Sequence, residues 1–261
     1  MILAIDIGNT NIEAGVIDDK KIHFTERIST DRDKTELEYA VLFKTVMDIH
    51  GVTPSDISGS IISSVVPPLT HIMKEAVRKL IKKPDPLVVG AGLKTGLDIK
   101  IDDPRTLGAD LVVDSVAGMA EYGAPLIIVD MGTATTITVL NKDKTYIGGV
   151  IVPGVRTSLE ALVSDTSQLP RVSLSSPDKF ICTNTVDCMK SGIINGQASL
   201  VDGMIDRFID ELGYDAKVVA TGGLSKVIIP KCRHDIILDD SLMMKGLKII
   251  YDRNKPRVKE R

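Results

Sequence analysis

The feature that most constrains the fold is an internal repeat of a strand, a tight turn and a second strand. The first copy is Ile5-Asp6-Ile7-Gly8-Asn9-Thr10-Asn11-Ile12, and it continues to Ile17. The second copy is Val129-Asp130-Met131-Gly132-Thr133-Ala134-Thr135-Thr136, and it continues to Leu140. In each copy an apolar strand runs into Asp-x-Gly, small polar residues follow, and a β-rich segment begins. The copies lie nearly half the chain apart, and such internal similarity sets the architecture of a protein.

Each copy is followed by a charged turn and a third strand-like run, at residues 22–28 and 145–151. We therefore predict an α/β fold of two duplicated domains, residues 1–120 and 121–261, each beginning with three strands. The expected sheets are mixed and flanked by helices. The chain has 261 residues, which is long enough for two domains of ordinary size.

Apolar periodicity and breakers place the remaining elements. Helices are expected over residues 35–50, 69–82, 108–122, from 157, 185–212 and 242–252, and strands over 60–66, 87–89, 126–129 and 218–221. The last of these strands ends in Thr221-Gly222-Gly223. The basic tail from residue 253 to 261 is expected to be solvated.

Composition narrows the possible partners and location. The net charge is −3 and only 3% of residues are aromatic, with no Trp, so we expect no nucleic-acid partner. No apolar run is long enough for a secretory signal or a membrane span. The three cysteines, Cys182, Cys188 and Cys232, are odd in number and form no Cys-x-x-Cys pair. A cytoplasmic protein without disulfides is therefore the expectation.

The repeated turn has the residue types of a phosphate site. Its glycine lets the backbone approach a ligand, and its N–H groups and hydroxyls can face an anion. Its Asp places a carboxylate beside the phosphates, where Mg²⁺ can bridge. One such turn is also an ordinary hairpin, but two in one chain, with a late Gly-Gly turn that could pass close to an adenosine, favour a nucleotide site. There is no Gly-x-x-x-x-Gly-Lys-Ser/Thr, and residues 90–96 have the wrong spacing for a dinucleotide fingerprint.

A third carboxylate, Asp110, follows Gly108 at the start of a predicted helix. One interpretation is that it complements the positive end of the helix dipole. The other is catalytic, because phosphoryl transfer to an alcohol needs in-line positioning, cations over the phosphates and an acceptor for the hydroxyl proton. Both interpretations stay open from the residues alone.

These motifs together resemble the superfamily of acetate and sugar kinases, Hsp70 and actin, whose domains are actin-like (ribonuclease H-like). Within it the chain is similar to the type III pantothenate kinase family. The similarity rests on Asp-x-Gly-Asn-Thr at 6–10, Gly-Ala-Asp at 108–110, Asp-x-Gly-Thr-Ala-Thr-Thr at 130–136, Gly-Gly-x-Ile-x-Pro-Gly at 148–154 and Asn-Thr at 184–185. The motifs span nearly the whole chain and keep their order.

The resemblance implies ATP-dependent phosphorylation of the pantothenate 4′-hydroxyl, the first step of coenzyme A synthesis. It implies Mg²⁺ and a monovalent cation, K⁺ or NH₄⁺, as cofactors and a homodimer as the assembly. It assigns the ATP phosphates to Asp6, Ile7, Gly8, Asn9, Thr10, Asn11, Ile12 and Glu13, a further ATP contact to Thr133, and pantothenate contacts to Gly108, Ala109, Asp110, Leu111 and Thr185. Asp110 is the implied proton acceptor, Asp130 the implied monovalent-cation ligand, and Thr185 is implied to lie near a dimer interface.

One position departs from the family pattern, which has Arg directly after Gly-Ala-Asp where this chain has Leu111. An Arg there could pair with the substrate carboxylate or the transferring phosphate. Arg105 or a neighbouring subunit could supply that charge instead. The departure keeps open a kinase for another small hydroxy acid or sugar. A nucleotide-binding regulator without catalysis is a further alternative, which the presence of all three carboxylates disfavours.

Overall fold

The computed structural model describes residues 1–82 and 84–255, and its contacts divide the chain into two compact units. Unit 1 comprises Met1–Leu97, Asp103–Ala117 and the segment from Leu242. Unit 2 comprises Asp98–Asp102 and Gly118–Ser241. The last helix therefore groups with the first unit, although it belongs to the second half of the sequence. Of the tail expected to be solvated, Arg253 and Asn254 are helical, and residues 256–261 lie outside the described residues.

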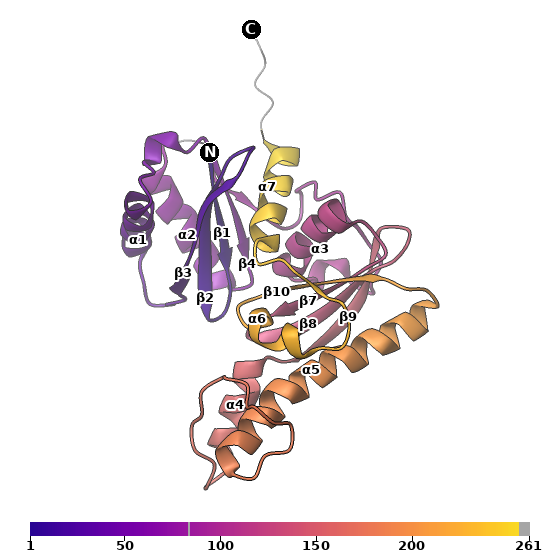
Figure 1. The fold of residues 1–261 in the computed structure, drawn as a ribbon. Helices are drawn as coiled ribbons and strands as arrows, with labels where there is room; N and C mark the ends of the chain where they lie inside the picture. The colour runs from indigo at the N-terminus through magenta and orange to yellow at the C-terminus, as the bar shows by residue number, and fades with distance from the viewer. Residues whose placement is uncertain (83, 256–261) are drawn as a thin grey trace. The chain divides into compact units, whose positions relative to one another are not determined.

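Unit 1 contains a five-stranded sheet with the order β3-β2-β1-β4-β5 (Figure 1). Its strands are β1 (Ile2–Ile7), β2 (Asn11–Ile17), β3 (Ile22–Ser29), β4 (Gly59–Ser64) and β5 (Leu87–Val88). β1 pairs antiparallel with β2 and parallel with β4. The tight turn thus joins β1, the middle strand of this sheet, to its neighbour β2.

Unit 1 also contains helices, some of which pack on this sheet through apolar stripes. They are α1 (Glu36–Ile49), α2 (Pro67–Leu80), the first part of α3 (Ala109–Tyr122) and α7 (Leu242–Asn254). Side chains spaced one turn apart on α1, Tyr39, Phe43 and Met47, are buried in the same core as Leu3 and Ile5 of β1. α7 packs against β1, β2 and β4.

Unit 2 contains a six-stranded sheet with the order β11-β10-β7-β8-β9-β6. Its strands are β6 (Asp98–Ile99), β7 (Leu126–Met131), β8 (Ala134–Leu140), β9 (Thr145–Pro153), β10 (Lys217–Thr221) and β11 (Ile237–Leu238). β7 pairs antiparallel with β8 and parallel with β10. The sheet therefore repeats the plan of unit 1 and adds β6 outside β9.

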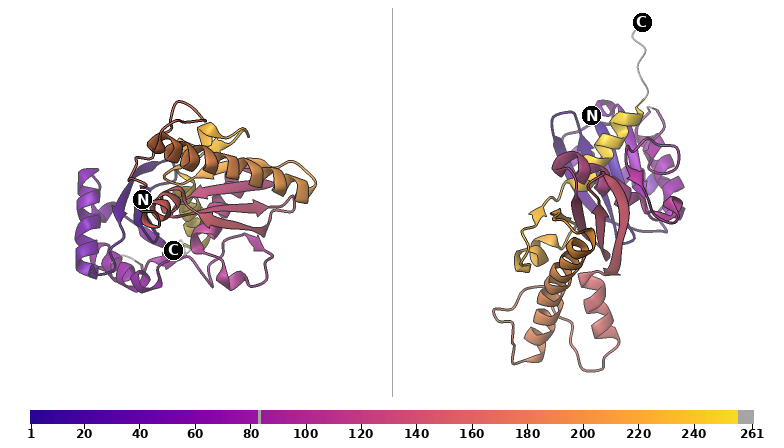
Figure 2. Two further views of the ribbon diagram at one scale, coloured as in Figure 1. Left: turned by 90° about the horizontal axis from the view of Figure 1, so that it is seen from below. Right: turned by 90° about the vertical axis from the view of Figure 1, so that its right-hand side faces the viewer.

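The helices of unit 2 are α4 (Val155–Ser164), α5 (Thr185–Leu212) and α6 (Ser225–Ile228). Ile194, Ala198, Val201 and Ile205 of α5 lie on one stripe and are buried with the apolar residues of β7 and β10. α4 packs on α5, and the two helices extend together beyond the edge of the sheet (Figures 1 and 2). Short 3₁₀ turns occupy Pro54–Asp56, Pro104–Thr106 and Ile229–Lys231.

The two sheets confirm the predicted α/β fold of two actin-like units with mixed sheets flanked by helices. Strands β1 to β5 have the order 3-2-1-4-5, and the matching strands of unit 2 follow the same plan with β9, β8, β7, β10 and β11. Each third strand also carries a register shift against its partner, at Val16/Ile17 and at Val139/Leu140. Within the described residues, no helix combines the length and the apolar character needed to cross a bilayer.

Candidate active site

The first predicted phosphate turn connects β1 and β2. Asp6 pairs with Glu13 and Ile7 with Ile12, which leaves residues 8–11 as the turn. Gly8 N donates a hydrogen bond to Asn11 O over 3.0 Å. A Cβ atom at residue 8 would lie 3.0 Å from that same oxygen, so glycine lets the turn close tightly. Asn9, Thr10 and Asn11 are exposed at the tip of the turn.

Residues that follow β3 hold this turn from outside. Thr30 N donates to Thr10 O over 2.9 Å, and Thr30 Oγ1 donates to Gly8 O over 2.7 Å. Arg32 Nη2 donates to Asn9 Oδ1 over 3.4 Å. Because the carbonyl groups of Gly8 and Thr10 are both bonded to Thr30, these contacts hold the turn in one shape.

Three of the predicted ATP-binding residues have mainly structural side chains. Ile7 and Ile12 are fully buried in the core of unit 1, so only their backbone can face a ligand. Glu13 accepts two hydrogen bonds from Arg27, and the shorter of them is 2.7 Å. The groups left for phosphate contact are the Asp6 carboxylate, which is half-buried, and the small residues of the turn.

The second predicted turn connects β7 and β8 in unit 2. Asp130 pairs with Thr136 and Met131 with Thr135, so this turn is one residue shorter than the first. Gly132 N donates to Ala134 O over 3.0 Å, and Thr133 is exposed at the tip. Its closing hydrogen bond therefore matches that of the first turn.

Two segments outside the hairpin contact this second turn, one by hydrogen bonds and one by close approach. Gly154, which caps the N-terminus of α4, donates from N to Thr133 O over 3.1 Å. Thr157 Oγ1 of α4 donates to the same oxygen over 2.8 Å. Gly222, the residue directly after β10, lies so close to Asp130 that a Cβ atom at position 222 would be 2.6 Å from Asp130 Oδ1. The sequence singled out both glycines in motifs, but it gave no sign that they meet this turn.

Asp110 lies in the first turn of α3, in unit 1, and its side chain is half-buried. Burial raises the pKa of the Asp110 carboxyl, and the hydrogen bond of 2.8 Å that Leu111 N donates to Oδ1 opposes this shift more weakly. A Cβ atom on residue 108 would lie 2.4 Å from Asp110 Oδ1, so Gly108 leaves the space that the carboxylate occupies. A carboxylate that holds a proton more readily is a better proton acceptor.

Leu111 carries no positive charge, and Arg105, which could have supplied one, is paired with Asp103. The Arg105 guanidinium donates Nε to Asp103 Oδ1 over 2.9 Å, and its side chain is 89% exposed. This contact lowers the pKa of the Asp103 carboxyl. Leu111 itself is half-buried and offers only an apolar surface next to Asp110.

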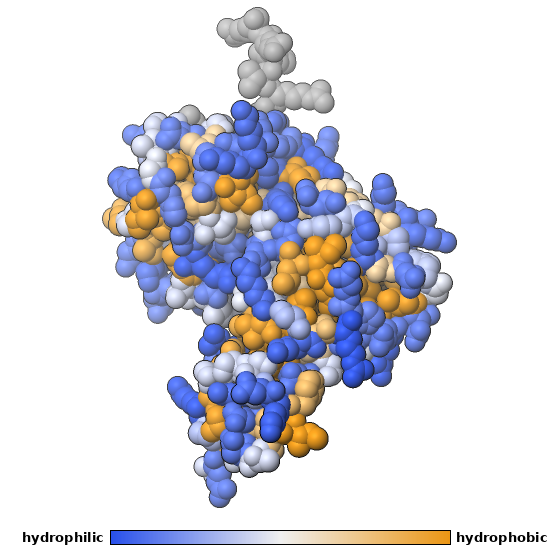
Figure 3. Space-filling model, viewed as in Figure 1, coloured by the Kyte–Doolittle hydropathy of each residue, from blue (hydrophilic) through white to orange (hydrophobic). Residues whose placement is uncertain are grey.

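Thr185 is the first residue of α5, the helix that extends with α4 beyond the edge of the unit 2 sheet (Figure 1). The preceding residue, Asn184, caps the helix by accepting a hydrogen bond of 2.9 Å from Asp187 N. Phe180 and Ile181 are 70% and 87% exposed just before it. Figure 3 shows apolar side chains scattered among hydrophilic ones over this extension.

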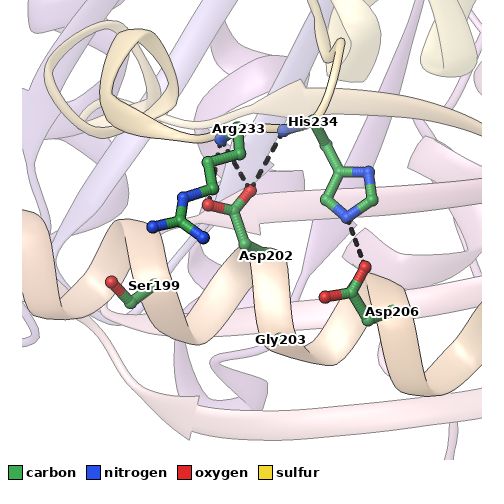
Figure 4. Close-up of a pocket in the computed structure, with 6 residues that line it drawn as sticks. All are labelled: Ser199, Asp202, Gly203, Asp206, Arg233 and His234. Atoms are coloured by element: carbon green, nitrogen blue, oxygen red, sulfur yellow. Dashed lines mark hydrogen bonds and ion pairs between the residues drawn. The ribbon is translucent and has the colours of Figure 1, made fainter.

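A hollow of about 340 Å³ lies between α5 and the loop after α6, and it contains none of the predicted site residues (Figure 4). Asp202 accepts hydrogen bonds of 2.9 Å and 3.2 Å from the backbone N–H groups of Arg233 and His234. His234 Nε2 lies 2.8 Å from Asp206 Oδ1. The two carboxylates of the hollow are bonded to the loop, so they join α5 to that loop, and no predicted site residue lies here.

The predicted residues thus fall into groups within each unit. Unit 1 carries the turn at 8–11, with Asp6 beside it, and the segment 108–111. Unit 2 carries Asp130 and Thr133 in one turn, and it places Thr185 on the helical extension. Among the described residues no group of three or more His, Cys, Asp or Glu side chains could hold a metal ion. A cation at Asp130 would therefore need backbone oxygens, water or phosphate oxygens, which are the hard donors that Mg²⁺ and K⁺ take.

The two units define a protein with an actin-like fold, and solved structures with the same fold match nearly the whole chain. A conserved Baf family chain from Campylobacter jejuni is 20% identical with a TM-score of 0.59, and the match covers 97% of this chain and 98% of that one. The (R)-2-hydroxyglutaryl-CoA dehydratase component A from Acidaminococcus fermentans is 13% identical with a TM-score of 0.57, and the match covers 96% of each chain. The ethanolamine utilization protein EutJ from Carboxydothermus hydrogenoformans is 12% identical with a TM-score of 0.53, over 95% of this chain and 89% of that one.

The match to a family model identifies the chain more narrowly than the shared fold does. The model of the type III pantothenate kinase family matches residues 2–207, which include both turns, Asp110 and Thr185. The chain belongs to the type III pantothenate kinase family. It is accordingly a kinase that uses a nucleotide.

Proposed function

We propose that this protein transfers the γ-phosphoryl group of ATP to the 4′-hydroxyl of pantothenate. The observation that carries the proposal is the pair of glycine turns. Each turn is closed by a hydrogen bond from its glycine N to the carbonyl of the last turn residue, and each is bonded to residues that follow its third strand. Thr30 N bonds to Thr10 O in unit 1 as Gly154 N bonds to Thr133 O in unit 2. Two turns held in this way are pre-organised for phosphates, because a backbone that is already fixed needs no rearrangement to meet the anion.

In this proposal the turn at 8–11 and Thr133 hold the ATP phosphates. Asp6 lies beside the first turn and Asp130 beside the second, where oxygen donors suit Mg²⁺ and a monovalent cation respectively. When bound, these cations supply positive charge over the phosphate oxygens.

Asp110 is the proposed general base. Its carboxylate accepts the proton of the 4′-hydroxyl as that oxygen forms a bond to the γ-phosphorus. The bond from the γ-phosphorus to the bridging oxygen breaks, and ADP leaves with the electron pair. The raised pKa of Asp110 supports this role, since a carboxylate with a pKa nearer the working pH accepts a proton more readily.

The activity is tested directly by incubating purified protein with ATP, Mg²⁺, K⁺ and pantothenate. We expect 4′-phosphopantothenate and ADP in equal amounts by mass spectrometry. The parallel reaction with NH₄⁺ in place of K⁺ measures the cation preference. The absence of phosphorylated product with either cation would count against the proposal.

A kinase for another acceptor is the second candidate, and Leu111 favours it. An apolar side chain next to the proposed base cannot pair with the carboxylate of an acid substrate. A panel of small hydroxy acids and sugars, compared by kcat/KM, separates the two candidates. Pantothenate is expected to give the highest kcat/KM. A higher kcat/KM for a neutral sugar would show that the sugar is the preferred acceptor. ATP binding without ADP release for any acceptor would instead indicate a regulator.

A further inference from the structure

We propose that Gly154 and Gly222 are positioning residues that hold the turn between β7 and β8 from two sides. Gly222 fixes the Asp130 carboxylate, and Gly154 fixes the backbone of Thr133. The proposal deepens the proposed function and rests on it, because Asp130 is its cation ligand and Thr133 its ATP contact. Neither glycine needs to touch a ligand to act in this way.

Gly222 follows the residue that pairs with Asp130. β10 lies parallel to β7, and Thr221, which is buried, is the register partner of Asp130. The chain then turns at Gly222 with a φ of +92°, a conformation that L side chains rarely adopt. A Cβ atom here would lie 2.6 Å from Asp130 Oδ1 and 2.6 Å from Met131 N. Even one methyl group must therefore displace the carboxylate or the end of β7.

Gly154 is glycine for a different reason. Its φ of −65° and ψ of 163° suit any residue, so backbone strain does not demand glycine. A Cβ atom at this position would lie 2.4 Å from Thr133 O and 2.5 Å from Gly132 O. The missing side chain lets Gly154 N reach Thr133 O over 3.1 Å. An added methyl group must push the turn away and lengthen that hydrogen bond.

The two contacts act on different groups, which makes their effects separable. At Gly222 the nearest atoms are a carboxylate oxygen of Asp130 and the backbone of Met131 at the end of β7, whereas at Gly154 the nearest atoms are the carbonyl oxygens of the turn. Displacing a group that orients a cation ligand typically lowers cation affinity by about 10–100-fold. Displacing a phosphate-holding turn by about 1 Å can cost up to about 100-fold in the step that it serves. Gly222 should therefore govern the cation and Gly154 the nucleotide.

The test compares Gly222→Ala and Gly154→Ala with Gly213→Ala as a matched control. Gly213 ends α5 with a φ of +71°, and no atom lies within 4 Å of a Cβ placed there. Gly213→Ala therefore introduces the same kind of left-handed backbone strain without touching the turn. The measurements are the K⁺ concentration for half-maximal activity, the Kd of a fluorescent ATP analogue and the thermal unfolding midpoint.

We expect Gly222→Ala to raise the half-maximal K⁺ concentration about 10-fold or more, with the nucleotide Kd changed less than about 3-fold. Gly154→Ala is expected to raise the nucleotide Kd about 10-fold or more and to leave the K⁺ dependence close to that of the parent. Equal losses of K⁺ response and nucleotide affinity in both variants would overturn the proposal. So would values for either variant that match Gly213→Ala.

A readout independent of turnover keeps the two proposals apart. The ¹³C NMR signal of the Asp130 carboxyl is assigned by its absence from Asp130→Asn. Gly222→Ala should shift this signal, whereas Gly154→Ala and Gly213→Ala should not. If the parent protein makes no phosphopantothenate, the proposed function fails, while the carboxyl signal and the nucleotide Kd still decide the positioning roles. An unmoved signal in Gly222→Ala would refute the role of Gly222 whatever the activity.

Discussion

The burial of Asp110 bears on the two roles that its position in the sequence allows, helix-dipole complement and proton acceptor. A first-turn carboxylate that only complements the helix dipole is stabilised in its charged form, which lowers its pKa. In this structure burial acts in the opposite direction and raises the pKa of Asp110. The carboxylate is thus held in a place that disfavours its charge, which is common at functional sites and favours the catalytic role.

Replacing Asp110 with Asn should slow phosphorylation by about 10²–10⁴-fold, because the amide keeps the shape but cannot accept the hydroxyl proton. The Kd for ATP should change little. The measurement is kcat from a coupled ADP assay together with nucleotide binding. Asp102→Asn, at an exposed carboxylate of the preceding segment, is the control and should retain the parent kcat. A kcat for Asp110→Asn within a few-fold of the parent value would remove Asp110 from the mechanism.

The raised pKa of Asp110 also predicts two pH effects. The acid limb of kcat/KM should fall at a pH above the ordinary Asp value of 3.8 and should be absent from the residual activity of Asp110→Asn. Between 3.8 and the raised pKa the folded protein binds more protons than the unfolded chain, so the free energy of unfolding decreases as the pH rises through this interval. Asp110→Asn should therefore unfold at a higher temperature than the parent at pH 7, and this gain should vanish near pH 3. A lower unfolding temperature at pH 7 would contradict the direction of the shift.

At the level of elements, the start of α5 is secured by one side chain. Asn184 Oδ1 accepts from Asp187 N, and its Nδ2 donates to Asp187 Oδ2 over 2.7 Å. The cap leads directly into Thr185, so the shape of the first turn determines where that hydroxyl lies. Without the cap, the first N–H groups of the helix lose their protein acceptor.

Asn184→Ala should destabilise the start of α5 by about 1 kcal/mol, the usual cost of losing a side-chain cap. Hydrogen–deuterium exchange of the first turn should accelerate, while exchange near Val201 in the buried part of the helix should not. If Thr185 contacts pantothenate, the KM for pantothenate should rise with kcat for ATP turnover largely retained. Asn184→Ser keeps a capping oxygen and should restore both properties. Unchanged exchange in Asn184→Ala would show that this cap is dispensable.

At the level of the whole molecule, we propose a homodimer formed through the helical extension of unit 2. Phe180 and Ile181 are among the most exposed large apolar side chains of the described chain, and both precede Thr185. Burying an exposed side chain of this size on association contributes about 1.5–3 kcal/mol. The placement of Thr185 near an interface, which the family resemblance implies, gives this apolar pair a reason to lie there.

Ile181→Asp should convert a dimer to a monomer, because a carboxylate at a buried interface loses its hydration without a partner. Light scattering coupled to size-exclusion chromatography measures the mass directly. Leu37→Asp on α1 is the control, since Leu37 is 61% exposed in unit 1 and should leave the dimer intact. A parent protein that is a monomer at micromolar concentration would contradict the dimer, as would an Ile181→Asp variant that stays dimeric.

The sequence alone predicted the elements that are determined by local chemistry. The two hairpins were recognisable because an apolar strand, Asp-x-Gly, small polar residues and a β-rich segment follow each other within a short stretch, and because this motif occurs twice. The long helix over 185–212 was predicted with the bounds observed, since its apolar stripe is extended and Asn184 and Gly213 mark its ends. The two-residue strands β6 and β11 were missed, because so short a segment has no periodicity to detect and exists only where a neighbouring strand pairs with it.

Only the tertiary structure decided how distant segments meet. The grouping of α7 with unit 1 depends on its packing against β1, β2 and β4, which lie at the other end of the chain. The burial that raises the pKa of Asp110 and the approach of Gly154 and Gly222 to one turn are likewise contacts between residues far apart in sequence. Sequence patterns report the conformation of neighbouring residues, whereas desolvation and close contact depend on which surfaces are brought together on folding. The sequence therefore identified the candidate site residues, and the tertiary structure determined their burial and their contacts.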